Sequence, residues 1–243
     1  MTGAARTLVV MPAFNESATV ASVIAEVRRA LPDVACLVVD DGSRDDTSGV
    51  ARRAGALVAQ LPYNLGVGGA MRLGFKYAIE QGYDNVVQID ADGQHDPAQV
   101  PQLLAALEHA DVVIGARFAG EGDYEVRGPR RWAMKLLSST LSGAAKTKLT
   151  DTTSGFKASG PRAVALFAEH YPAEYLGDTI EALVLAVRNG CTVTQVPVAM
   201  RPRGGGVPSH NPVKAGVYLL RAFLALIVAF IRPAERPRAE GVA

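Results

Sequence analysis

The sequence predicts an α/β fold in which a mainly parallel central sheet is flanked by helices. Short runs of β-branched residues alternate with longer stretches that carry apolar residues at helical spacing. This strand-helix-strand order is typical of parallel sheets. The composition agrees, because 49% of the 243 residues are hydrophobic and 20% are charged, as in a globular protein with a sizeable core.

The first half of the chain shows the clearest alternation. The expected strands cover residues 7–11, 35–41, 56–61, 85–90 and 112–115. The expected helices between them cover residues 17–30, 46–54, 67–81 and 97–109. Ser17 suits an N-cap, and Pro97 suits a first helical turn, where the missing N–H of proline costs no hydrogen bond.

The second half is less regular after Gly120. We expect a helix from about residue 131 to 145, a polar segment over residues 151–158 and a second helix over residues 179–188. We take residues 1–210 as one domain with two halves, which are residues 1–118 and 119–210. A C-terminal segment over residues 211–243 follows.

Charge and cysteine content exclude several classes of protein. Lys and Arg number 25 against 24 Asp and Glu, without a long block of like charge, so nucleic acid is not an expected partner. Cys36 and Cys191 fit reduced thiols in a cytoplasm better than a disulfide framework, and they exclude a cysteine-based metal site. Residues 1–6 are too short and polar for a signal peptide. The longest uncharged apolar run, residues 222–231, is well below the roughly 20 residues that span a bilayer.

Polar and acidic residues follow three of the predicted strands, in segments 12–16, 40–43 and 90–92. Ligands of open parallel sheets bind beyond the carboxyl ends of the strands. Asp90 and Asp92 are two residues apart in an extended chain, so their side chains point the same way and can reach one cation. Mg²⁺ or Mn²⁺ takes such oxygen ligands together with substrate phosphates. A polar turn after a strand is the alternative interpretation of this spacing.

Three segments in this order resemble motifs of the inverting family 2 glycosyltransferases. They are Pro12-Ala-Phe-Asn-Glu16, Val39-Asp-Asp-Gly-Ser43 and Asp90-Ala-Asp-Gly-Gln-His-Asp-Pro97. The branch that they resemble most is the dolichyl-phosphate mannosyltransferase-like or polyprenyl-phosphate glycosyltransferase group. Matching motifs extend to about Ser209 and cover most of the chain. The resemblance implies a GT-A (Rossmann-like) fold, with residues 1–118 as the nucleotide-sugar-binding half and 119–210 as the acceptor-side half.

The resemblance also implies the donor site. Pro12, Phe14, Glu16 and Asp41 would surround the base and ribose, and Asp90, Asp92 and Gln94 would hold the diphosphate and a Mg²⁺ or Mn²⁺ ion. Family members usually have Tyr at the position of Phe14, so any hydroxyl contact there is lost. Asp40 and Asp41 could instead cap the next helix.

The glycines of Asn64-Leu-Gly-Val-Gly-Gly69 open a predicted helix, where the backbone N–H groups of Gly66 and Gly69 could approach the donor. Tight backbone geometry alone is the alternative. The segment misses the spacing of a dinucleotide-binding fingerprint.

Several arginines supply guanidinium groups suited to phosphate. The resemblance places Arg201 on the donor and Arg117 in catalysis. It places Arg117, Arg130, Arg131 and Ser154 on the acceptor phosphate. Arg127 and Arg203 belong to the same set, and each arginine could instead be a solvated surface charge.

Asp151-Thr-Thr-Ser-Gly-Phe156 resembles the acceptor-side D-x-x-S-G-F segment of the family, and Glu181 lies where relatives have an acid on a helix, with Asp178 one turn earlier. The candidate catalytic residues are therefore Asp92, Arg117, Asp151 and Glu181. Such an acid would act as a base toward a hydroxyl acceptor. A phosphate monoester, with a second pKa of about 6, is already nucleophilic near neutral pH. With that acceptor Asp151 and Glu181 could equally position it.

The segment from Gly204 to His210 resembles the R-x-x-G-x-S loop of the family, with Pro208 as an interruption and His210 in place of a usual Lys. Residues 213–231 are helical in composition and nearly apolar on all sides, and basic residues surround them. An interfacial helix on anionic lipid is expected. A contact with another subunit or a small membrane partner, or a core-packed helix, is the alternative.

Together these features predict metal-dependent, inverting transfer of a hexose from a UDP- or GDP-hexose to polyprenyl phosphate at the cytoplasmic membrane face. The first alternative is a soluble family 2 glycosyltransferase that acts on a sugar, glycan or small-molecule hydroxyl, with Glu181 or Asp178 as the base. The second is a nucleotide-sensing module without catalysis.

Overall fold

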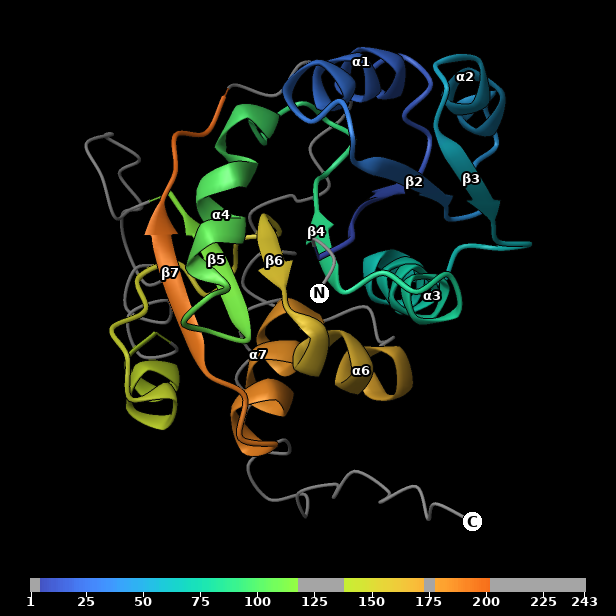
Figure 1. The fold of residues 1–243 in the computed structure, drawn as a ribbon. Coiled ribbons are helices and arrows are strands. Elements are labelled where there is room, and N and C mark those ends of the chain that lie inside the picture. The colour runs from blue at the N-terminus through green and yellow to red at the C-terminus, as the bar shows by residue number, and fades with distance from the viewer. Residues whose placement is uncertain (1–4, 118–137, 173–177, 202–243) are drawn as a thin grey trace, which may run out of the picture.

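The computed structural model describes residues 5–117, 138–172 and 178–201. In this part of the chain a central sheet is covered by helices on both faces (Figure 1). The strands are β1 (Thr7–Ala13), β2 (Ala35–Asp40), β3 (Leu57–Gln60), β4 (Asn85–Gln88), β5 (Val112–Ala116), β6 (Lys157–Ser159) and β7 (Val193–Pro197). The helices are α1 (Val20–Ala30), α2 (Thr47–Arg53), α3 (Gly66–Glu80), α4 (Val100–Ala106), α6 (Pro161–His170) and α7 (Asp178–Arg188), and the 3₁₀ turn η1 (Pro97–Gln99) leads into α4. Residues 138–145 are also helical.

The strand order is β3-β2-β1-β4-β6-β5-β7. Strand β6 runs antiparallel to both β4 and β5, and the other pairings among the described strands are parallel. The predicted α/β class and mainly parallel sheet are therefore confirmed, with β6 as the antiparallel exception that makes the sheet mixed.

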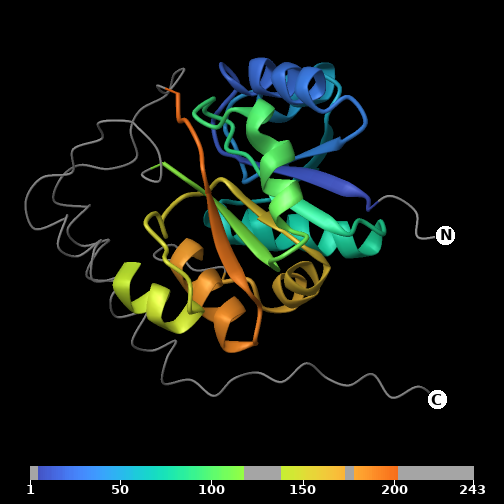
Figure 2. The same ribbon diagram turned by 60° about the vertical axis from the view of Figure 1, so that its left-hand side comes forward.

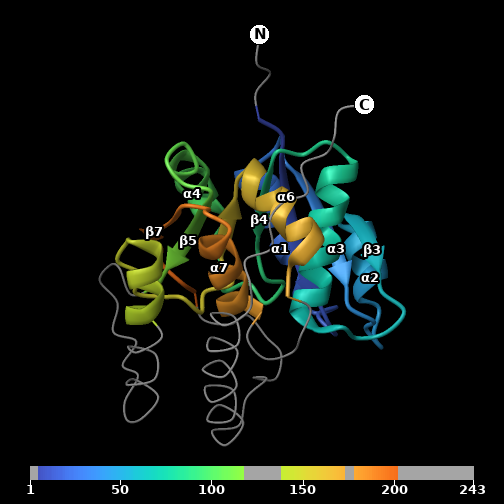
Figure 3. The same ribbon diagram turned by 90° about the horizontal axis from the view of Figure 1, so that it is seen from below.

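Each face of the sheet buries its own hydrophobic core. Alternate residues of β1 divide between the cores, because neighbouring side chains of a strand point to opposite faces. Leu8 and Val10 pack with residues of α3, α6 and α7. Val9 and Met11 pack with residues of α1, α2 and α4. Figure 2 shows α1 and α4 on one side of the sheet, and Figure 3 shows α3, α6 and α7 gathered on the other.

The predicted elements of the first half are confirmed, with end shifts of a few residues. The Ser17 N-cap is wrong: α1 begins at Val20, Thr19 occupies the N-cap position, and no side-chain cap bond forms there. The helix start at Pro97 is confirmed, because Asp96 Oδ1 accepts a hydrogen bond from Ala98 N at 3.0 Å.

The second half contains elements that the sequence analysis missed. Strands β6 and β7 and helix α6 were not expected, whereas the expected helix over residues 179–188 is α7. The helix expected from residue 131 is present over residues 138–145, and its start lies outside the described residues. The C-terminal segment 211–243 also lies outside them. No helix within the described ranges is long and apolar enough to cross a membrane.

Candidate active site

Three strand ends lie side by side at one edge of the sheet. β2, β1 and β4 are consecutive in the strand order and parallel. Main-chain pairing continues past the strands, because Asp41 N donates to the Ala13 carbonyl at 2.8 Å and Ile89 N to the Val10 carbonyl at 3.1 Å. The polar segments after these strands are thereby brought to one edge, where ligands of open α/β sheets bind.

Hydrogen bonds join the loops that follow β1 and β2. Asn15 N donates to Ser43 Oγ at 2.9 Å, and Arg44 N donates to Asn15 Oδ1 at 2.8 Å. Glu16 N donates to Thr47 Oγ1 at 2.9 Å. Asn15 adopts a φ of 57°, a left-handed conformation that asparagine tolerates better than most residues. The two loops therefore form one connected rim.

Three of the residues predicted to surround the base lie on this rim, namely Phe14, Glu16 and Asp41, and the fourth lies in the strand before it. Pro12 is buried within β1, in register with Val39 of β2. Phe14 is 43% exposed, so its ring has surface available to a flat ligand. Glu16 is half-buried, and its Oε2 accepts from Thr19 Oγ1 at 2.8 Å.

Asp40 and Asp41 are buried and stabilise two different helices. Asp40 accepts from the hydroxyl of Ser48 in α2. Asp41 accepts from Leu65 N at 2.6 Å and Gly66 N at 2.8 Å, at the start of α3. Burial raises the pKa of Asp41, the two N–H groups oppose this rise, and the charge of Asp40 adds to it. A carboxylate offers about four acceptor sites, so Asp41 can accept further hydrogen bonds from a ligand. Its role in binding the donor stays a prediction.

Close packing shapes the glycine-rich start of α3. Gly66 has a φ of 81°, which favours glycine. A Cβ on Gly69 would lie 2.5 Å from the Cβ of Leu65. These positions support the interpretation of tight backbone geometry, and donor contact by either glycine stays a prediction.

Asp92 lies in a turn that begins at Ala91, so the extended chain expected through Asp90 and Asp92 is wrong. The two residues also differ in their surroundings. Asp92 is 8% exposed, and its Oδ1 accepts from Gln94 N at 3.0 Å. The side chain of Asp90 is 37% exposed. Its Oδ1 accepts from Gln88 Nε2 at 3.2 Å, and His95 Nε2 lies 3.7 Å from its Oδ2.

The ligand types at this turn suit a hard divalent cation. Mg²⁺ is commonly held by one or two carboxylates together with substrate phosphates and water. Within the described ranges, no group of three or more His, Cys, Asp or Glu could hold a metal. Asp90 and Asp92 therefore fit an ion that would take its remaining ligands from a diphosphate and water.

Arg117, which directly follows β5, forms a bidentate pair with Asp151. Arg117 Nε donates to Asp151 Oδ2 at 2.6 Å, and Nη2 donates to Oδ1 at 3.0 Å. Asp151 is fully buried, whereas the Arg117 side chain is 36% exposed. Thr153 Oγ1 donates to Asp151 Oδ1 at 3.1 Å as well. Both carboxylate oxygens are engaged, and the pair holds the Arg117 guanidinium in place. The catalytic role of Asp151 stays a prediction.

The D-x-x-S-G-F segment reaches the end of β4. Ser154 is buried, and its Oγ accepts from Phe156 N at 3.3 Å. A Cβ on Gly155 would lie 3.0 Å from Asp90 Oδ2. The structure thus brings the D-x-x-S-G-F segment directly against Asp90, and the phosphate-binding role of Ser154 stays a prediction.

Arg201 is paired on the side of α1. Its Nη1 lies 2.5 Å from Glu26 Oε2, and its Nη2 lies 2.8 Å from Asp96 Oδ1. The main-chain N–H of Arg201 donates to the Gln94 carbonyl at 3.0 Å. The hydrogen bond from Arg201 to Glu26 raises the pKa of Arg201 further. The predicted contact with the donor would require the guanidinium to exchange these partners.

The remaining candidates lie on α7 or outside the described residues. Glu181 lies half-buried in the first turns of α7, which begins at Asp178. The candidates Arg127, Arg130, Arg131, Arg203 and His210 lie outside the described residues.

Gln88, His95 and Gly155 all approach Asp90, and none of these contacts was predicted from the sequence. Gln88 carries a weak signal, because a residue two positions before Asp90 on an extended chain points to the same side. Gly155 carries no local signal, since its contact with Asp90 joins distant parts of the chain.

In the described part of the chain, the mixed seven-strand sheet and its acidic edge define a GT-A-like α/β fold. A crystal structure of glucosyl-3-phosphoglycerate synthase from Mycobacterium tuberculosis in complex with Mn²⁺, UDP and phosphoglyceric acid matches with a TM-score of 0.69, at 23% identity, over 94% of this chain and 80% of that one. A structure of the same enzyme with Mg²⁺ and UDP matches with a TM-score of 0.68, at 23% identity, over 97% and 81%. At this identity the likeness shows the fold alone.

The chain belongs to glycosyl transferase family 2, whose profile matches residues 8–164. The undecaprenyl-phosphate mannosyltransferase of Micrococcus luteus is 32% identical over 208 residues, which are 82% of this chain and 84% of that protein. The polyprenol monophosphomannose synthase of Mycolicibacterium smegmatis is 30% identical over 216 residues, 83% and 80% of the two chains. The resemblance of the motifs is confirmed, and the protein is a nucleotide-sugar-dependent hexosyltransferase.

Proposed function

We propose that this enzyme transfers a hexose, with inversion, from a nucleoside diphosphate sugar to polyprenyl phosphate at the cytoplasmic face of a membrane. The observation that carries the proposal is the approach of Gly155, on the acceptor-side segment, to Asp90 at the donor-side strand end. A donor diphosphate and an acceptor phosphate bound to these two segments would meet. The names of the Micrococcus and Mycolicibacterium relatives support a polyprenyl phosphate acceptor.

The donor, a UDP- or GDP-hexose, is proposed to bind along the joined loops. The exposed ring of Phe14 packs on the base. Glu16 and Asp41 accept hydrogen bonds from base N–H or ribose hydroxyl groups. Asp90 and Asp92, with Gln94, would hold Mg²⁺ or Mn²⁺. When bound, the ion offsets the negative charge that develops on the departing nucleoside diphosphate.

The acceptor phosphate is proposed to lie beside Arg117, with Arg130, Arg131 and Ser154 as further contacts. Asp151 fixes the plane of the Arg117 guanidinium through the bidentate pair. Guanidinium has five N–H donors in a rigid fork, which suits a phosphate that must be oriented.

The acceptor supplies the nucleophile itself, because a phosphate monoester with a second pKa of about 6 is mostly dianionic near neutral pH. Its oxygen attacks the anomeric carbon in line, the new carbon–oxygen bond forms, and the bond to the diphosphate breaks. In this scheme Asp151 and Glu181 position the acceptor side, and neither is required as a base.

The membrane is proposed as the place of the reaction. The segment beyond residue 200 carries seven basic and two acidic side chains, so it is cationic. Near an anionic surface each basic residue contributes about 1 kcal/mol of attraction. Another subunit or a small membrane protein is the alternative contact for the apolar stretch 213–231.

Replacement of Asp92 tests the proposal. Asp92→Asn is expected to lower transfer of labelled sugar into organic-phase polyprenyl phosphate by on the order of 100-fold or more, the scale of one lost electrostatic stabiliser. Asp33→Asn, at an exposed position between α1 and β2, is the matched control and should keep wild-type transfer. Wild-type turnover of Asp92→Asn at saturating Mg²⁺ or Mn²⁺ would defeat the metal assignment.

The same extraction separates the alternative functions. A hydroxyl acceptor would be identified if the label enters an aqueous product while polyprenyl phosphate stays unlabelled. Glu181 or Asp178 would then be the base to replace next. Binding of nucleoside diphosphate without transfer or hydrolysis of the sugar would identify a sensing module.

A further inference from the structure

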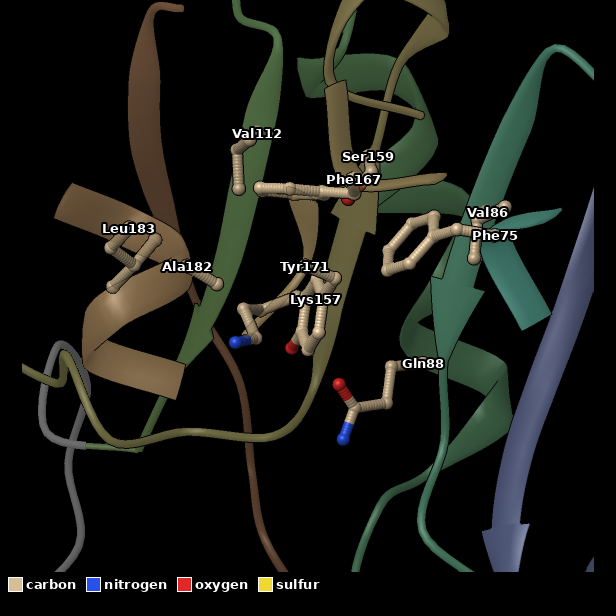
Figure 4. A pocket seen from close by; sticks show the side chains of 10 residues that line it. All are labelled: Phe75, Val86, Gln88, Val112, Lys157, Ser159, Phe167, Tyr171, Ala182 and Leu183. Atoms are coloured by element: carbon tan, nitrogen blue, oxygen red, sulfur yellow. The ribbon is translucent and has the colours of Figure 1, made fainter. Parts of the chain in front are cut away.

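Asp90 is contacted by a buried side chain from the face of the sheet that α3, α6 and α7 cover. Gln88 is 5% exposed, and its Nε2 donates to Asp90 Oδ1 at 3.2 Å. Gln88 lies opposite Lys157 in the ladder of β4 with β6. Figure 4 shows the side chains of Gln88, Lys157 and Tyr171 directed into the same pocket. This enclosure restricts the rotamers of Gln88 and therefore the direction of its amide.

A second buried side chain reaches Asp90 from the face that α1 and α4 cover. His95 is 4% exposed, and its ring stacks on Phe156, with 5.0 Å between centroids and 15° between planes. His95 Nδ1 accepts the N–H of Asp90 at 3.0 Å. Because Nδ1 is an acceptor, the proton of the neutral ring is assigned to Nε2, the atom that lies 3.7 Å from Asp90 Oδ2.

The third neighbour of Asp90 is the main chain of Gly155. A Cβ at this position would lie 3.0 Å from Asp90 Oδ2 and 3.2 Å from Gln88 Nε2. A larger residue would therefore press on both members of the Gln88–Asp90 hydrogen bond. Gly155 leaves the space in which this bond can form.

We propose that Gln88 and His95 are positioning residues that set the orientation of the Asp90 carboxylate for a divalent cation, and that Gly155 keeps room for that arrangement. This inference rests on the proposed function, in which Asp90 is a metal ligand. The physical reason is preorganisation: a carboxylate that is restrained by the Gln88 hydrogen bond and by buried neighbours before the ion arrives loses less rotamer freedom on binding. Removal of outer-shell partners of metal ligands typically lowers metal affinity by about 10–100-fold.

The test measures Mn²⁺ affinity of the full chain in the presence of UDP, by electron paramagnetic resonance of free Mn²⁺. Gln88→Met removes the amide at nearly constant side-chain length. His95→Asn keeps an acceptor near the Nδ1 position and removes the ring nitrogen Nε2, which faces Asp90 Oδ2. Each variant is expected to raise the Kd for Mn²⁺ by about 10–100-fold. The Kd for UDP without metal should stay within twofold of wild type.

Matched controls separate positioning from general damage. Gln60→Met, at the exposed end of β3, and His109→Asn, at an exposed position after α4, should bind Mn²⁺ as the wild type does. Excess Mn²⁺ should restore most of kcat to Gln88→Met but not to Asp90→Asn, because only the latter loses a ligand. If a buried variant fails to fold, Gly155→Ala decides, since it disturbs the same carboxylate from another segment and should also raise the Kd for Mn²⁺.

Two results would overturn different claims. If Gln88→Met, His95→Asn and Gly155→Ala bind Mn²⁺ within twofold of wild type while Asp90→Asn binds it poorly, the positioning role is wrong and the proposed function stands. If Asp90→Asn and Asp92→Asn also leave Mn²⁺ affinity unchanged, the metal site of the proposed function is wrong.

Discussion

For a single charged residue, the surroundings determine how much its ion pair contributes to the stability of the fold. Asp151 is fully buried and bound at both oxygens by Arg117. Asp46 and Arg53 form an ion pair of the same 2.6 Å length, with side chains 64% and 68% exposed. Water screens the exposed pair, whereas loss of Arg117 would leave a buried carboxylate without its counter-charge.

Arg117→Ala is expected to lower the free energy of unfolding by about 3–5 kcal/mol, the scale for breaking a buried pair, with the lower end favoured because Arg117 is partly exposed. Arg53→Ala, the matched control, should cost at most about 1 kcal/mol. Urea titration at pH 7 measures both values. Equal losses of unfolding free energy in the two variants would show that the Arg117–Asp151 pair stabilises the fold no more than the exposed pair does.

The pH dependence of Asp45 provides a second residue-level prediction. Burial alone would raise the pKa of Asp45, but hydrogen bonds from Thr47 and Ser17 bring it below its ordinary 3.8. A lowered pKa in the folded state stabilises the protein at pH values above 3.8, and this contribution disappears as the pH falls through the folded-state pKa.

Asp45→Asn should therefore be less stable than wild type at pH 7 and pH 5, and the difference should shrink as the pH falls below 4. Urea midpoints at a series of pH values measure this. A stability difference that grows toward acid pH would contradict the sign of the shift.

At the level of helices and strands, the contact between α3 and β1 packs the glycine-rich helix against the strand that leads into Phe14. Gly74 makes this contact possible, because a Cβ there would lie 2.4 Å from Val10 Cγ1. Gly143, in the helical residues 138–145, has nothing within 4 Å of its Cβ position.

The two glycines are predicted to respond to alanine with opposite signs. Gly143→Ala should stabilise the protein by up to about 1 kcal/mol through helix propensity. Gly74→Ala gains the same propensity but overpacks the core, which costs about 1–3 kcal/mol, so a net loss is expected. Thermal and urea unfolding of both variants measure the difference. Stabilisation by Gly74→Ala would mean that α3 can shift away from β1 at little cost.

At the scale of the whole molecule, the donor and its ion should stabilise the fold together. The segments proposed to bind them come from the ends of β1, β2 and β4 and from the start of α3, so a bound donor would connect several elements. A ligand at about 100 times its Kd adds about 2.7 kcal/mol to the free energy of unfolding.

Thermal shifts with UDP-glucose, UDP-galactose and GDP-mannose, each with and without Mn²⁺, should therefore reveal the donor. The matching nucleotide sugar with Mn²⁺ is expected to raise the Tm by roughly 5–10 °C, at about 2–4 °C per kcal/mol for a chain of this size. In Asp92→Asn the Mn²⁺-dependent part should disappear. An equal shift without Mn²⁺ in the wild-type protein would argue against a metal-bound diphosphate.

Local sequence patterns were sufficient to predict the parallel half of the sheet and its acidic edge. Strands such as β2 and helices such as α1 carry strong local periodicity, and the motifs around Asp40 and Asp90 stand directly at strand ends. Such signals depend only on neighbouring residues, so they can be recognised without a structure.

The contacts between distant charges and side chains depend on how the strands and helices pack together, and they could not be predicted from the sequence. β6 is three residues long and pairs on both sides, too short for a periodic signal. Its place between β4 and β5 brings Gly155 to Asp90, while Asp151 meets Arg117, 34 positions earlier. Strand order and burial determine which arginine each carboxylate contacts. Such contacts join remote segments through the packing of the whole fold, so they leave no pattern in the local sequence.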